Sequence, residues 1–146
     1  MNIKYRFLAI AIALVFPASL VAADKTAAGP KGGRLLENTD PAAEVFVHAD
    51  RRLEITFYDA TLQPRARAAQ QAAVTAELPE QRTSIELIPT ATGFKSQEPL
   101  PAGEPYRLVV QLRERPEARP RNFRIMLNLE PCAECSYAEY ACVCGH

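Results

Sequence analysis

Apolar and polar side chains alternate along the middle of the chain, and this alternation predicts β-strands. The runs 53–58 (LEITFY) and 123–129 (FRIMLNL) have an apolar residue at every second position. A period of two is typical of a strand with one buried face. Further strands are expected at 43–48, 74–78, 83–88, 92–96 and 106–112. About seven short strands joined by turns rich in Pro and Gly predict an all-β fold, a small antiparallel β-sandwich.

The start of the chain has the pattern of an export signal. A basic segment and the apolar run 7–16 (FLAIAIALVF) precede Val21-Ala22-Ala23. A membrane span needs about 20 apolar residues, so the shorter run predicts a cleaved signal peptide over 1–23. We therefore expect an exported, periplasmic protein that keeps no stable membrane anchor after cleavage.

The remainder of the chain divides into three parts. Residues 24–33 (DKTAAGPKGG) have little to bury and are expected as a flexible leader. Residues 34–130 contain the predicted strands and are expected to form the sandwich domain. Residues 131–146 are the Cys-rich tail. Within the sandwich, the Ala-rich segment 65–74 stays ambiguous, because its composition also favours a helix.

Composition and charge narrow the function classes. The chain has 17 basic and 17 acidic residues, so it lacks the basic footprint of a nucleic-acid-binding protein. Its two histidines, His48 and His146, are far apart in sequence. No nucleophile–histidine–acid set or pair of carboxylates can be read from so few candidates. The sequence predicts a binding protein without catalytic residues, rather than an enzyme.

All 4 cysteines lie in the tail, in the spacing C-x2-C-x6-C-x-C-x-H. A C-x2-C pair is the usual half of a tetrahedral metal site. Thiolates and imidazole select zinc(II) or copper(I) over magnesium or calcium. The expected metal ligands are Cys132, Cys135, Cys142, Cys144 and His146.

The same cysteines allow two other hypotheses. An exported chain with an even number of cysteines commonly forms structural disulfides. A strand followed by Cys132-x-x-Cys135 and a helix-compatible segment also resembles the local order of a thiol oxidoreductase. The sequence leaves these alternatives open.

Residues 29–37 (GPKGGRLLE) resemble the start of the N-terminal β-domain in periplasmic adaptor subunits of heavy-metal RND efflux systems. Residues 54–64 are similar to the second strand of that module and its turn. The family often has His where this chain has Lys31, so no metal role is transferred to that turn. We expect none of the hairpin, lipoyl and barrel domains of a full adaptor from these 146 residues. The Cys-rich tail is not part of the adaptor module, but is similar to that of small exported bacterial proteins.

Together these features predict an exported protein that binds a soft metal ion. The resemblance implies an accessory role in heavy-metal efflux or homeostasis, with a subunit of an efflux complex as partner. The alternative is a periplasmic interaction module that binds its partner through a strand edge. Its C-terminal cysteines would then form structural disulfides.

Overall fold

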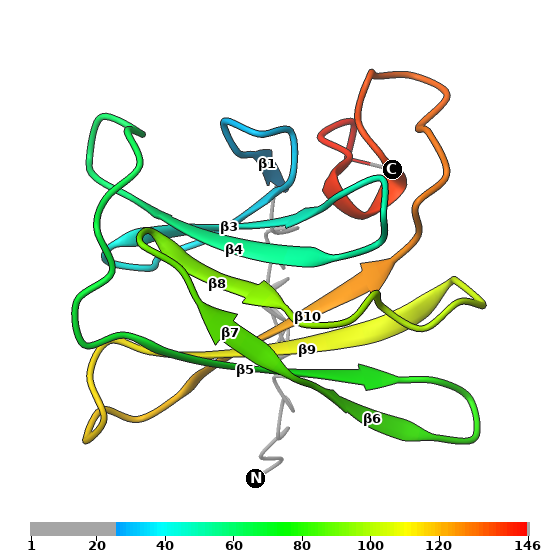
Figure 1. The fold of residues 1–146 in the computed structure, drawn as a ribbon. Helices are drawn as coiled ribbons and strands as arrows, with labels where there is room; N and C mark the ends of the chain where they lie inside the picture. Colours follow the sequence, from blue (N-terminus) through cyan, green and yellow to red (C-terminus); the bar gives the residue numbers. More distant parts are fainter. Residues whose placement is uncertain (1–25, 146) are drawn as a thin grey trace, which may run out of the picture.

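The computed structural model describes residues 26–145 and confirms the all-β prediction. Two antiparallel sheets pack face to face, as Figure 1 shows. The predicted signal peptide (1–23) and His146 lie outside the described residues. Within the described part, no helix has the length and apolar character needed to cross a membrane.

One sheet has the strand order β1-β2-β3-β4-β8-β7, and the other has the order β10-β9-β5-β6. The bounds are β1 (Ala27–Ala28), β2 (Arg34–Leu36), β3 (Ala42–Val47), β4 (Leu53–Tyr58), β5 (Gln71–Glu77), β6 (Arg82–Ile85), β7 (Leu87–Pro89), β8 (Gly93–Ser96), β9 (Tyr106–Arg113) and β10 (Arg121–Leu127), with one 3₁₀ turn, η1 (Glu139–Ala141).

The alternating positions of the sequence form the core between the sheets. In β9 and β10, buried side chains alternate with exposed ones, as the period of two predicts. Burial of these apolar side chains is the main favourable contribution to folding. The core includes Val45, Leu53, Ile55, Val74, Leu108, Val110, Ile125 and Leu127.

The described residues contain ten strands, rather than the expected seven or so. Two additional strands, β1 and β2, are so short that alternation cannot show in the sequence. The predicted run 83–88 is divided at Glu86 into β6 and β7, which belong to different sheets. The ambiguous segment 65–74 forms no helix, and β5 begins within it at Gln71.

The turn between β1 and β2 surrounds a buried carboxylate. Glu44 on β3 is fully buried, and its Oε1 accepts hydrogen bonds from the backbone N–H groups of Gly33 (2.7 Å) and Lys31 (3.1 Å). The Tyr58 hydroxyl donates to Oε2 at 2.6 Å. A Cβ atom on Gly29 would lie 2.2 Å from Glu44 Cδ, so this position requires glycine. Residues expected as a flexible leader therefore contribute β1 and part of a close-packed turn.

The Cys-rich tail packs on the sandwich. After β10, the backbone N–H of Glu139 donates to the carbonyl of Glu130 (2.9 Å), and that of Tyr140 donates to Asn128 (3.1 Å). The side chain of Tyr140 is buried, and its hydroxyl accepts a hydrogen bond from the backbone N–H of Val47 on β3. These contacts place the cysteines beside one end of the sandwich.

Candidate metal centre

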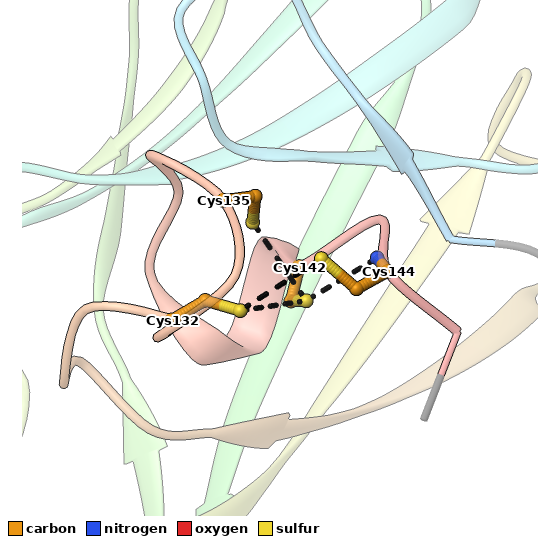
Figure 2. A group of neighbouring side chains, drawn as sticks. All are labelled: Cys132, Cys135, Cys142 and Cys144. Carbon is orange, nitrogen blue, oxygen red and sulfur yellow. Dashed lines mark hydrogen bonds between the residues drawn. The ribbon is translucent and has the colours of Figure 1, made fainter.

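The structure brings the four cysteines of the tail together. Their Sγ atoms all lie within 4.8 Å of one another, and Figure 2 shows these side chains converging from the loop and from the segment after η1. All four are free thiols. Three pairs are within hydrogen-bond distance: the sulfur atoms are 3.2 Å apart for Cys132–Cys142, 3.8 Å for Cys135–Cys142 and 3.9 Å for Cys132–Cys144.

These distances fit a tetrahedral metal site. Zinc–thiolate bonds of about 2.3 Å at tetrahedral angles place the sulfur atoms about 3.8 Å apart. Two of the three distances given above, 3.8 and 3.9 Å, already have this value. The 3.2 Å pair has to open by about 0.6 Å, and no pair has to close by more than about 1 Å, because all four sulfur atoms lie within 4.8 Å of one another. Four cysteines in this arrangement could hold one metal ion.

A short loop and the 3₁₀ turn create this arrangement. The bridge between Pro131 and Ala138 closes the loop, inside which the backbone N–H of Cys132 donates to the Tyr137 carbonyl at 2.9 Å. The turn η1 then reverses the chain and returns Cys142 to the first pair of cysteines. A C-x2-C pair and a C-x-C pair therefore face each other at small cost in chain entropy.

Ionisation differs among the cysteines. The backbone N–H of Tyr137 lowers the pKa of Cys135 to about 7. A side-chain hydrogen bond with Cys142 and the other neighbouring thiols raises the pKa of Cys144. The backbone N–H of Cys144 lowers the pKa of Cys142, but the hydrogen bond with the Cys132 thiol and desolvation both raise it. The net effect is that the pKa of Cys142 is raised. Neighbouring thiolates repel one another, so a bound cation would favour the fully ionised set.

The tail has both a buried and an open side. Cys132 is buried, Cys135 and Cys142 are half-buried, and Cys144 is exposed. His146, the fifth expected ligand, lies outside the described residues.

The sequence reading did not single out Tyr137, whose backbone groups interact with both Cys132 and Cys135. Its ring also faces the β1–β2 turn, where a Cβ on Gly32 would lie 3.6 Å from it. Backbone contacts of this kind have no sequence signature.

Comparisons with protein-family models, curated proteins and solved structures found no match to this chain. The functional assignment therefore depends on the chemistry and geometry of the chain itself.

Proposed function

We propose that this protein is an exported metal-binding protein that holds a soft transition metal ion through the four cysteines of its tail. The observation that carries this proposal is the convergence of the four Sγ atoms within 4.8 Å. Four thiolates suit zinc(II), which takes tetrahedral sulfur sites, and they also suit copper(I). Because copper(I) is satisfied by fewer thiolates, the four-sulfur set favours zinc(II).

The uneven burial of the cysteines supports a role in metal handling. A closed structural site would shield all its ligands, whereas Cys144 is exposed. An exposed thiolate gives an acceptor molecule access to the bound ion. We therefore assign the tail to reversible binding and transfer of metal.

The proposed setting is the periplasm, in heavy-metal efflux or homeostasis. Two features of the sequence support it: the export signal and the resemblance of residues 29–37 to metal-efflux adaptors. The turn in this segment also lies against the Cys-rich loop, through Gly32 and the ring of Tyr137. A subunit of an efflux complex is the proposed recipient of the metal.

Metal titration of the reduced, metal-free mature chain tests the proposal. We expect one zinc(II) per chain by native mass spectrometry, and sulfur-to-metal charge-transfer bands when cobalt(II) replaces zinc. Cys135→Ser should weaken binding at least about tenfold, because ligand loss costs more than the loss of a supporting contact. Ser136→Ala changes the adjacent residue without removing a thiol, and is the matched control.

The outcome for the fold separates the two possible roles of the tail. Weakened metal binding together with an intact sandwich in Cys135→Ser supports a handling site, whereas global unfolding of this variant would make the tail structural. Absence of metal binding by the reduced wild-type chain would overturn the proposal.

The alternative is an interaction module with a disulfide-bonded tail. The 3.2 Å separation of the Cys132 and Cys142 sulfur atoms favours it, because a small movement would join them. Chains recovered from the oxidising periplasm without reductant would then be metal-free. Each disulfide would lower their mass by about 2 Da.

A further inference from the structure

The strand β10 forms one edge of the smaller sheet. It pairs with β9 along its whole length, and within the described residues no strand pairs with its other side. Alternate backbone N–H and C=O groups of an edge strand point away from the sheet and can accept a further strand. At seven residues, β10 is long enough for several such hydrogen bonds.

A groove runs between β10 and the strand β2 of the other sheet. Its volume is about 350 Å³, and three arginines line it: Arg34 from β2, and Arg121 and Arg124 from β10. Among the described residues, Glu37 is the only acidic one in the lining. Leu35 and Phe123, both half-buried, add apolar surface to the same groove.

These arginines form no ion pair with the residues that the structure describes. The six ion pairs found there involve other cations, among them Arg82 and Arg107, which both pair with Glu77. Arg121 lies over the Phe123 ring, 5.6 Å from its centroid. This stacking leaves the in-plane N–H groups of the guanidinium available, and their fork geometry matches a carboxylate.

We propose that β10 and its groove bind an acidic, extended peptide segment of a partner protein, which adds to the sheet as a further strand. The unpaired main chain of β10 supplies the hydrogen bonds, and the three arginines select carboxylate side chains. The apolar part of the groove accepts the alternate side chains of the segment. The same positive charge disfavours pairing of two β10 edges, because like charges would come together.

A peptide rather than a nucleic acid is the partner that these observations favour. A free strand edge beside an apolar lining recognises an extended main chain, whereas a polyanion would need only the charge. This interface uses none of the cysteines, so it can be tested without the metal.

Fluorescence anisotropy of the mature chain tests the proposal, with a labelled peptide of about nine alternating glutamate and valine residues as probe. The double variant Arg121→Gln/Arg124→Gln should weaken binding about tenfold, and binding should weaken as salt rises. Arg82→Gln makes the same kind of charge change on β6, at the opposite edge of this sheet, and should change affinity less than about twofold.

Hydrogen exchange identifies the mode of binding. Added peptide should slow exchange of alternate β10 amides, and a peptide with proline at alternate positions should not bind. No binding, or equal binding by the double variant, would overturn the proposal. A competition experiment with an oligothymidylate gives a further outcome that would overturn the proposal. If it displaces the peptide while the exchange of the β10 amides is not slowed, the groove is a general polyanion site.

Discussion

The backbone N–H of Val47 donates a hydrogen bond to the hydroxyl of Tyr140 at 3.0 Å, across 93 positions of sequence. Tyr140 is only 4% exposed, and it lies between Cys135 and Cys142 in the chain. Burial raises the pKa of its hydroxyl. The Cys-rich tail is therefore attached to β3 of the sandwich by a side chain that the cysteine pattern does not reveal.

Replacing Tyr140 by phenylalanine tests this attachment. The variant keeps the ring but leaves the buried N–H of Val47 without a partner, which costs about 1–3 kcal/mol of unfolding free energy. Urea denaturation should detect the loss. Tyr137→Phe is the control, because within residues 26–145 its hydroxyl has no hydrogen bond; equal stability of both variants would contradict the assigned role of Tyr140.

Metal binding should release fewer protons as the pH rises through about 7, the pKa of Cys135. Below this pH the Cys135 thiol must lose its proton to bind metal, whereas above it the thiolate is already present. The pKa of Cys144 is raised, so this thiol still has to lose its proton on metal binding both below and above pH 7.

Affinity should therefore increase with pH, with a slope that decreases by about one proton above pH 7. Calorimetry in buffers of different ionisation enthalpy measures the protons released. In Cys135→Ser this change of slope should disappear, and its persistence would assign the lowered pKa to another group.

Oxidation of the metal-free protein should first join Cys132 and Cys142. Their sulfur atoms are 3.2 Å apart, compared with 3.8 Å for Cys135 and Cys142 and 3.9 Å for Cys132 and Cys144. A limiting amount of oxidised glutathione, followed by alkylation and peptide mapping, identifies the first disulfide. Bound zinc should slow the reaction, because metal coordination occupies the thiolates. A first disulfide between Cys142 and Cys144 would contradict this order.

Glu44 provides a test of the β1–β2 turn. Glu44→Ala removes the acceptor for the backbone of Lys31 and Gly33 and leaves a cavity, so we expect a loss of about 3–5 kcal/mol. Glu44→Gln should cost less, because its amide oxygen can still face Gly33 while the Tyr58 hydroxyl accepts from the amide nitrogen. Thermal unfolding of both variants should show this order, and equal losses would mean that the negative charge itself is required.

The strands and the cysteine cluster were accessible from the sequence because both depend on local spacing. The run 53–58 corresponds to β4, and the C-x2-C and C-x-C pairs do converge. The burial of Glu44 was not predictable, because its donors come from another strand, β4, and from the β1–β2 turn. The division at Glu86 was also hidden, since the alternation over 83–88 predicts a single strand.

That division at Glu86 has a mechanical consequence. A single stretch, 82–89, supplies the outermost strand of both sheets, β6 on one and β7 on the other. The two sheets are thus linked on one side through a single residue, Glu86, instead of through a long flexible loop. Neither sheet can separate from the other without disrupting the edge strand of its partner. The sandwich should therefore unfold as one cooperative unit.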